Sequence, residues 1–390
     1  MTASAQVHDP GETDIERFLR LSLQGRRNPA ALAGAEALAP ALDWPAVGQV
    51  AAAQRLGPLL HEALAGAGFA PAALLADWRV SFHDTARRNL RSLHELSQVL
   101  RGLRERRVEA LVLKGAALIP AVYGSLALRP LRDLDVLVRP EGLEPALECL
   151  AELGFHRVGM ERQPGSLTAF ENQAQLVKPG GLRTVVEIHW SLFDSPHYQN
   201  RLALDWFWQA PQTVEISGAP ANAPGQGAHF LYLAGHLWLH HHGVGLLWWN
   251  DLAEMAAQPA GMVDWEAVIG WAQSSDLVLS LQQVMAVLTR DWSTSLPAGV
   301  LDRMMGLRPT AAERRVFEAL RASARQAGKR LWVDLVSTPG WRQRVRFAWS
   351  NILPSADYMR VRYNIRHELL TPFYYPYRWL LGLRSALWKA

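Results

Sequence analysis

Two aspartates separated by a single residue lie in an apolar stretch of the sequence. Asp133 and Asp135 precede a run of aliphatic residues. Side chains two positions apart on a strand share a face, so the two carboxylates would repel each other unless a cation lay between them. Mg²⁺ is typically held by one or two carboxylates together with substrate phosphates. The pair therefore indicates a metal-bound phosphate site, or an edge strand whose aspartates pair with Arg129, Arg132 and Arg139.

Two further segments favour the metal site. Segment 108–115, VEALVLKG, reads as a buried strand and a turn into a helix, which would leave free N–H groups for an anion beside Lys114. Segment 185–190, VVEIHW, places Glu187 in another apolar strand, and His189 shares its face. Three carboxylates on neighbouring strands are suited to holding metal ions for in-line attack on phosphorus. His189 would contact nucleotide or acceptor, or serve as a hydrogen-bonded structural histidine.

The elements that must position these residues follow from the change in hydrophobic period along the chain. We expect an α+β protein with a small mixed sheet at 108–220, flanked by helical regions at 14–107 and 221–390, after a flexible leader at 1–13. The first helical region should hold four or five helices. In the second we expect helices at about 227–258, 264–274, 276–291, 310–327 and 340–352. Between the first and last regions we expect strands at 108–115, 131–138, 155–160, 167–178, 182–192 and 212–218, helices at 116–124 and 142–154, and a linker at 219–229.

Composition narrows the class of protein. The chain has 390 residues, of which 49% are hydrophobic and 19% charged, and its formal net charge of +4 suits an anionic ligand without singling out nucleic acid. One cysteine, Cys149, excludes a disulfide framework and a cysteine-based zinc site. The N-terminus lacks the features of a signal peptide, and no long uncharged apolar run is present. We therefore expect a cytoplasmic protein.

These motifs together resemble a known superfamily. A strand and turn ending in Lys-Gly, an Asp-x-Asp strand about 20 residues later and a third acid on a later strand are similar to polymerase-β-type nucleotidyltransferases. More narrowly, LKGAALIPAVYGSLALRPLRDLDVLVRP, then EIHW, then HHHGVGLLWWNDLAEM resemble an uncharacterised bacterial nucleotidyltransferase family over roughly residues 80–260. Some relatives are encoded beside genes for modified peptides such as lasso peptides. The sequence departs from the superfamily in two places: Lys114-Gly115-Ala116 replaces a Gly-Gly or Gly-Ser turn, and the third acid is Glu187 rather than aspartate.

The resemblance implies roles for individual residues. Asp133, Asp135 and Glu187 would be the catalytic residues and the ligands of Mg²⁺ or Mn²⁺, with Glu187 helping to deprotonate the acceptor hydroxyl. Lys114 and Gly115 would hold phosphate.

Three more positions would contact the substrates. Arg129 would face the triphosphate or the leaving pyrophosphate, and Asp251 and His189 would line the cleft for nucleotide or acceptor. The substrate would be an NTP, with ATP favoured. The acceptor would be a peptide, a protein or a small molecule, and nucleic acid is not favoured.

Two aromatic and basic segments keep more than one interpretation. The histidine cluster His236, His240, His241 and His242 has a pair four residues apart, as in helical zinc sites, but lacks the usual glutamate and an obvious third ligand. It could instead line the cleft, or pack in the core with its tryptophans. The C-terminal segment FYYPYRWLLGLRSALWKA could contact a membrane surface or pack as a terminal helix.

Two other functions compete with nucleotidyl transfer. A sugar-nucleotide glycosyltransferase also uses Asp-x-Asp on a metal, but would normally place a nucleotide-binding αβ segment where this chain has its first helical region. A degenerate transferase that binds a partner or peptide without catalysis would fit the altered glycine turn, whereas the retained acids argue against it.

Overall fold

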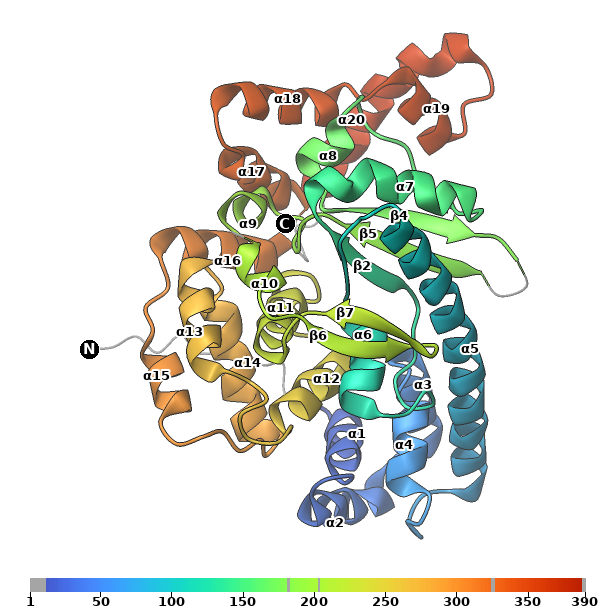
Figure 1. The fold of residues 1–390 in the computed structure, drawn as a ribbon, viewed down its shortest axis with the longest axis vertical. Helices are drawn as coiled ribbons and strands as arrows, with labels where there is room; N and C mark the ends of the chain where they lie inside the picture. The colour runs from blue at the N-terminus through green and yellow to red at the C-terminus, as the bar shows by residue number, and fades with distance from the viewer. Residues whose placement is uncertain (1–11, 181–182, 203, 324–326, 388–390) are drawn as a thin grey trace.

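A five-stranded mixed sheet with helices packed around it forms the centre of the structure (Figure 1). The computed structural model describes residues 12–180, 183–202, 204–323 and 327–387. The strand order is β1-β2-β5-β4-β3. These strands are β1 Ala110–Val112, β2 Leu134–Val138, β3 His156–Arg157, β4 Gln173–Lys178 and β5 Thr184–His189. The predicted α+β class, a small mixed sheet flanked by helical regions, is confirmed.

Strand pairing brings the two acidic strands together. β2 runs parallel to β5, with Asp135 directly opposite Glu187, whereas β1–β2, β5–β4 and β4–β3 are antiparallel. Because β2 and β5 are parallel, the chain must cross over between them. That crossover contains α7 Leu143–Glu152, β3, the short helix α8 Ser166–Phe170 and β4. Residues 167–170 were predicted as strand and are helical instead.

The two faces of the sheet differ in chemistry. Leu134 and Val136 of β2 and Val186 and Ile188 of β5 belong to a buried apolar cluster together with side chains of α5 and α7. Because side chains alternate along a strand, Asp135 and Glu187 point to the opposite face. The sheet is therefore anchored on one side by a core, and its other side is available for chemistry.

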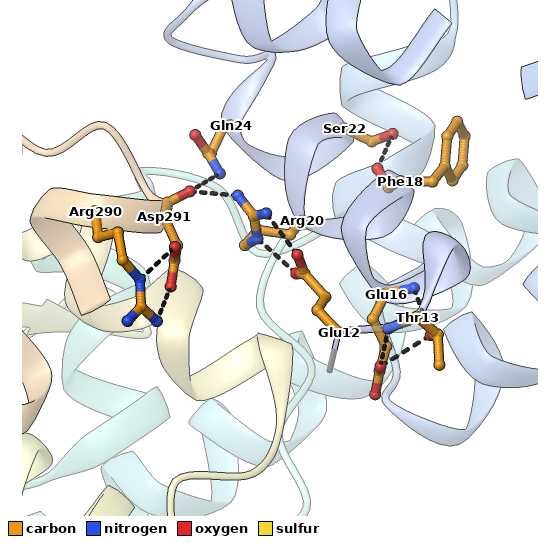
Figure 2. Close-up of polar contacts among 9 residues, drawn as sticks. All are labelled: Glu12, Thr13, Glu16, Phe18, Arg20, Ser22, Gln24, Arg290 and Asp291. Atoms are coloured by element: carbon orange, nitrogen blue, oxygen red, sulfur yellow. Dashed lines mark hydrogen bonds and ion pairs between the residues drawn. The ribbon is translucent and has the colours of Figure 1, made fainter. Parts of the chain in front are cut away.

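The N-terminal region forms five α-helices among the described residues, in agreement with the predicted four or five. They are α1 Asp14–Gln24, α2 Pro29–Leu38, α3 Trp44–Ala53, α4 Gly57–Leu64 and the 34-residue α5 Ala72–Glu105. Local sequence explains where these helices begin: Thr13 and Glu16 form a capping box on α1 (Figure 2), and Asn28 and Asp43 cap α2 and α3. Of the predicted leader 1–13, residues 1–11 lie outside the described residues.

The first helix is fastened to a distant part of the chain. The side chains of Arg20 and Gln24 both donate to the backbone carbonyl of Asp291, and Glu12 accepts two hydrogen bonds of 2.7 Å from Arg20 (Figure 2). One apolar core contains side chains of all three predicted regions, including Phe18 of α1. The bounds drawn between those regions stay a prediction.

A second, small sheet replaces the predicted linker. β6 Gln212–Ile216 pairs antiparallel with β7 Ala219–Ala223, so the prediction of an irregular segment at 219–229 was wrong. Ser217 and Gly218 both have positive φ (52° and 78°), as a two-residue hairpin turn requires. The small side chains of Ala221 and Ala223 are buried in the core beneath the sheet. This buried alternation stabilises a strand that its alanines and its proline do not favour.

Helices make up the rest of the described chain. Two short ones precede β6, and ten follow β7. Their bounds are α9 Pro196–Arg201, α10 Asp205–Trp208, α11 Gln226–Leu239, α12 Leu246–Ala256, α13 Trp265–Ser274, α14 Val278–Asp291, α15 Val300–Gly306, α16 Ala311–Ser323, α17 Ala327–Ser337, α18 Trp341–Ile352, α19 Ala356–Tyr363 and α20 Thr371–Leu387.

One predicted helix is broken in the structure. The expected helix at 227–258 is two helices, because the chain turns between α11 and α12 at Gly243 and Gly245, which have positive φ. Helices α9, α10, α15, α17 and α19 were not among those predicted. None of the helices in the described ranges is both long enough and apolar enough to cross a bilayer.

Candidate active site

Asp135, Glu187 and His189 bring one ligand atom each into a small volume on the polar face of the sheet. These atoms all lie within 4.8 Å of one another, and among the described residues this is the group that could hold a metal ion. His189 Nε2 lies 2.9 Å from Asp135 Oδ1 and 3.8 Å from Glu187 Oε2. The predicted common face of Glu187 and His189 is confirmed. Gln175, opposite Glu187 on β4, donates to Glu187 Oε1 at 3.0 Å and orients that carboxylate.

Lys114 places a positive charge on this group. Its Nζ lies 2.6 Å from Asp135 Oδ1. The residue begins the short helix α6 Lys114–Leu118 and has a left-handed backbone (φ 47°), which is uncommon outside glycine. Its backbone N–H donates to Nε2 of His229 at 3.0 Å. The turn after β1 is therefore held on one side by Asp135 of β2 and on the other by His229 of α11.

Burial and mutual charge set the protonation of the acids. Burial would raise the pKa of Asp135, but the Lys114 ammonium and the His189 hydrogen bond outweigh it and hold that pKa well below its usual range. The pKa of Glu187 is raised by burial and by the charge of Asp135. The pKa of His189 is lowered by burial, so its imidazole favours the neutral form that binds metals.

Asp133 lies immediately before β2 and is half-buried. Burial and the neighbouring charge of Asp135 raise its pKa, while Lys114 opposes both effects. Asp133 is therefore close enough to the other acids to interact electrostatically, although it lies outside the group within 4.8 Å. Its role as a metal ligand stays a prediction.

Arg129 and Asp251 contact each other. Arg129 Nη2 lies 2.7 Å from Asp251 Oδ2, Nε lies 2.8 Å from Oδ1, and both side chains are almost fully buried. Tyr123 donates to Asp251 Oδ1 at 2.6 Å, and Asn250 donates to the Tyr123 hydroxyl at 2.9 Å. This network joins α12 to the segment before β2. The predicted contacts of Arg129 and Asp251 with substrate stay predictions, and in this structure both side chains are engaged elsewhere.

Gly115 packs closely against the segment before β2 that contains Arg129 and Leu131. A Cβ at this position would lie 2.7 Å from Leu131 Cδ2 and 3.4 Å from Arg129 Nη1. Any side chain would therefore require Leu131 and Arg129 to shift their side chains in the segment that leads into β2. This packing explains the glycine without a bound phosphate, and its predicted phosphate contact is untested.

Arg55 belongs to the same neighbourhood and was missed in the sequence. It lies in the turn between α3 and α4, half-buried, with positive φ. Burial and the positive charges of Arg129 and Arg132 lower its pKa to about 10, against the opposing charges of Asp133 and Asp251. A cationic cluster thus adjoins the acids. Nothing in its local sequence distinguishes Arg55 from the many surface arginines of this chain.

One face of α11 covers the polar face of the sheet. His229, Tyr232 and His236 are buried and are spaced three and four residues apart, which places them along one side of the helix. Burial lowers the pKa of His229 to about 4, so its neutral ring can accept the Lys114 N–H. Burial raises the pKa of Tyr232, and the nearby Lys114 ammonium opposes that shift. The three- and four-residue spacing was a signal in the sequence, but only His236 was singled out.

The histidine cluster forms contacts of its own rather than a metal group. His236 Nε2 lies 3.1 Å from His241 Nε2, and His241 stacks on Trp248 with ring centroids 3.6 Å apart. His240 Nε2 lies 4.0 Å from Asp194. Within the described part of the chain, these histidines do not bring three ligand atoms together as Asp135, Glu187 and His189 do. The structure gives no support to the zinc interpretation.

The donor set of the site fits a divalent cation. Two carboxylates and a neutral imidazole converge, with a third carboxylate, Asp133, close enough to sense their charge. Carboxylate oxygens suit Mg²⁺ and Mn²⁺, and the imidazole is a better ligand for Mn²⁺ than for Mg²⁺.

Comparison with known proteins decides the family. Residues 40–292, more than half of the chain, match the model of an uncharacterised nucleotidyltransferase family. The chain belongs to this family. The match includes β1, β2, β5 and α11, and thus every residue of the site described above.

Other comparisons add little to the family assignment. The crystal structure of an antigenic nucleotidyltransferase-like protein from Paracoccidioides brasiliensis is similar over 53% of this chain and 95% of that chain. Its sequence identity is 14% and its TM-score 0.32, which is too low to support a structural inference. No curated protein matches this member of the nucleotidyltransferase family.

Proposed function

We propose that this protein transfers a nucleoside monophosphate from an NTP to a hydroxyl of a peptide, protein or small-molecule acceptor, with Mg²⁺ or Mn²⁺ at Asp135, Glu187 and His189 and with Asp133 beside them. The acceptor oxygen forms a bond to the α-phosphorus, the bond between that phosphorus and the oxygen bridging to the β-phosphate breaks, and pyrophosphate leaves. The hydroxyl proton passes to Glu187 or to solvent.

One observation carries the proposal: Asp135 and Glu187 lie directly opposite each other on adjacent parallel strands, with His189 on the same face. A divalent cation bound there supplies charge neutralisation for the phosphates. Asp135 is ionised at neutral pH because Lys114 and His189 stabilise its charge. Gln175 fixes the orientation of Glu187.

The altered turn keeps one glycine instead of Gly-Gly or Gly-Ser, so the phosphates depend more on cationic side chains, of which Lys114 is part of the turn itself. Lys114 lies beside Asp135, and Arg55 and Arg132 lie close enough to each other for their charges to interact. We assign these three residues to the triphosphate. Burial and then the positive charges of Arg129 and Arg132 lower the pKa of Arg55, and a bound anion would oppose both effects.

Arg129 and Asp251 receive a different role in this proposal. Their buried ion pair joins α12 to the segment that leads into Asp133, and so positions the acids rather than touching substrate. Gly115 contributes by letting that segment pack closely against α6. His229 of α11 accepts the Lys114 backbone N–H and so helps to hold Lys114 in place.

The test uses NTPs labelled at the α- or γ-phosphate, incubated with Mn²⁺ or Mg²⁺ and with pools of peptides and hydroxyl-bearing small molecules. The α-label should become covalently attached to an acceptor, and Asp135→Asn should reduce that rate by about 100-fold or more, since loss of outer-shell partners alone costs metal sites 10–100-fold. Asp84→Asn, on the exposed surface of α5, is the matched control and should leave the rate unchanged.

Other outcomes would replace the proposal. Transfer of the γ-label alone would indicate a kinase, and transfer from a labelled sugar nucleotide would indicate a glycosyltransferase. Calorimetric titration with a non-hydrolysable NTP and Mn²⁺ gives a measurement that does not depend on the acceptor. If no nucleotide binds, the protein is a non-catalytic member of its family.

A further inference from the structure

The C-terminal helices expose a row of large apolar side chains. On α18, Trp341, Val345, Trp349 and Ile352 are 71%, 58%, 57% and 52% exposed. Their spacing of four, four and three residues places them on one face of the helix. Single exposed apolar residues are ordinary on protein surfaces, whereas a contiguous row indicates an interaction surface.

The opposite side of α18 is already packed against the protein. Phe347 is buried and meets Phe170 of α8 edge-on, with ring centroids 5.2 Å apart. Ser350 is buried as well. Since these residues attach α18 to the protein, its exposed row is not needed for folding.

Helix α20 continues the apolar surface. Its Tyr375 hydroxyl donates to the carbonyl of Pro354 at 2.6 Å, and Trp379 Nε1 donates to the carbonyl of Ile352 at 2.8 Å, so α20 is fastened where the α18 row ends. Phe373 and Leu380 lie on the side of α20 opposite Tyr375 and Trp379, and they are 73% and 65% exposed. Helices α17 to α20 gather at the end of the molecule opposite α1 and α2 (Figure 1). The exposed rows of α18 and α20 are called the C-terminal apolar surface below.

The segment that carries this surface is also strongly basic. Residues 341–384 contain eight arginines and two acids, a net charge of +6, whereas the whole chain carries +4. Both acids, Asp357 and Glu368, pair with Arg360. Arg342 and Arg362 are exposed.

We propose that the C-terminal apolar surface docks on a membrane surface rich in anionic lipids. Exposed tryptophan and tyrosine side chains favour the headgroup boundary, aliphatic ones favour the acyl region just beneath it, and arginines pair with lipid phosphates. Docking would be peripheral, because no helix within the described ranges is suited to spanning the bilayer. The same charge disfavours pairing with a second copy of this chain, because two such surfaces would repel each other. Nucleic acid would use the arginines and aromatic rings but would leave Val345, Ile352 and Leu380 without a partner.

The test is co-sedimentation of the full-length protein with vesicles of phosphatidylcholine alone or of equal parts phosphatidylcholine and phosphatidylglycerol. Binding should require phosphatidylglycerol and should weaken as salt is raised. Trp341→Gln/Trp349→Gln should reduce binding at least tenfold. Arg342→Gln/Arg362→Gln should reduce it about 25-fold, from about fivefold for each arginine near an anionic surface. No transferase activity is measured, so failure here leaves the proposed function untouched.

Val80→Gln/Leu90→Gln is the matched control, because these α5 side chains are 61% and 58% exposed but lie outside the basic region. That variant should bind vesicles like the wild type. The proposal is overturned if the wild type does not sediment with anionic vesicles, or if both tryptophan and control variants bind equally well. It is also overturned if light scattering shows a dimer that Trp341→Gln/Trp349→Gln dissolves, or if a labelled oligonucleotide binds this surface while vesicles do not.

Discussion

The buried ion pair between Arg129 and Asp251 yields a quantitative prediction about stability. Three distances of 2.7–3.0 Å join the guanidinium to both carboxylate oxygens, and the two side chains are only 7% and 2% exposed. Removing one partner of such a pair leaves the other charge buried and typically costs 3–5 kcal/mol. Asp251→Asn keeps one oxygen acceptor for Tyr123, so we expect a loss near the lower end, about 3 kcal/mol.

Urea unfolding monitored by tryptophan fluorescence measures this loss, and Trp248 and Trp249 beside Asp251 provide local probes. The control is Asp84→Asn. Asp84 pairs with Arg87 on the surface of α5, where the two side chains are 41% and 77% exposed. That change should shift the free energy of unfolding by less than about 0.5 kcal/mol.

A double variant separates coupling from general damage. Arg129→Met/Asp251→Leu removes both charges and replaces them with apolar groups. Its loss of unfolding free energy should be smaller than the sum of the losses of Arg129→Met alone and Asp251→Leu alone by at least about 2 kcal/mol. Additive losses, or an Asp251→Asn protein as stable as the Asp84→Asn control, would falsify the coupling. A phosphate-binding Arg129 predicts the reverse pattern: weaker nucleotide binding with little change in stability.

Two further predictions concern positions outside the site. Burial raises the pKa of Glu313 from 4.5 to about 7, so the folded protein retains a proton there that the unfolded chain loses; this stabilisation is complete below pH 4.5 and disappears as pH rises through 7. The free energy of unfolding of Glu313→Gln should therefore equal that of the wild type near pH 4.5 and exceed it above pH 7 by at most about 3 kcal/mol, as measured by urea unfolding at each pH. An equal gain at both pH values would contradict this reasoning. At Gly102 of α5, a Cβ would lie 2.5 Å from Cys149 Sγ of α7. Gly102→Ala should lower the free energy of unfolding by about 1–3 kcal/mol in thermal or urea unfolding, despite the higher helix propensity of alanine. Adding Cys149→Ala should restore part of this loss. A Gly102→Ala protein as stable as the wild type would show that α7 can move away without cost.

Local pattern was sufficient for the elements that carry the acids. Apolar runs predicted strands at 131–138 and 182–192, which contain the observed β2 and β5, and period-two alternation placed Glu187 and His189 on one face. Asp133 was predicted inside the first of these strands and lies just before the observed β2. Strand order was not accessible in this way, because the parallel pairing of β2 with β5 depends on a crossover through α7, β3 and β4. The opposition of Asp135 and Glu187 is thus a property of topology rather than of either segment.

The sequence did not reveal contacts between residues that are far apart along the chain. Arg129 and Asp251 were each expected to face substrate, since a lone charge near a motif carries no sign of a pairing partner in another helix. Arg55 lies in the turn between α3 and α4, far from the motifs in the sequence. The β7 strand was hidden by its alanines and proline, because its stability comes from the hairpin turn and from burial of Ala221 and Ala223.

The core shared by the first and last helical regions limits how this protein can be dissected. The family match begins at residue 40, yet Phe18 of α1 and Leu320 of α16 lie outside the matched range and are buried in the same cluster as Leu113 beside the site. A fragment cut to residues 40–292 would expose this apolar surface to water and would lose the attachment of α1 to α14. The smallest autonomous folding unit that retains the transferase sheet is therefore larger than the sequence signature by which the family is identified.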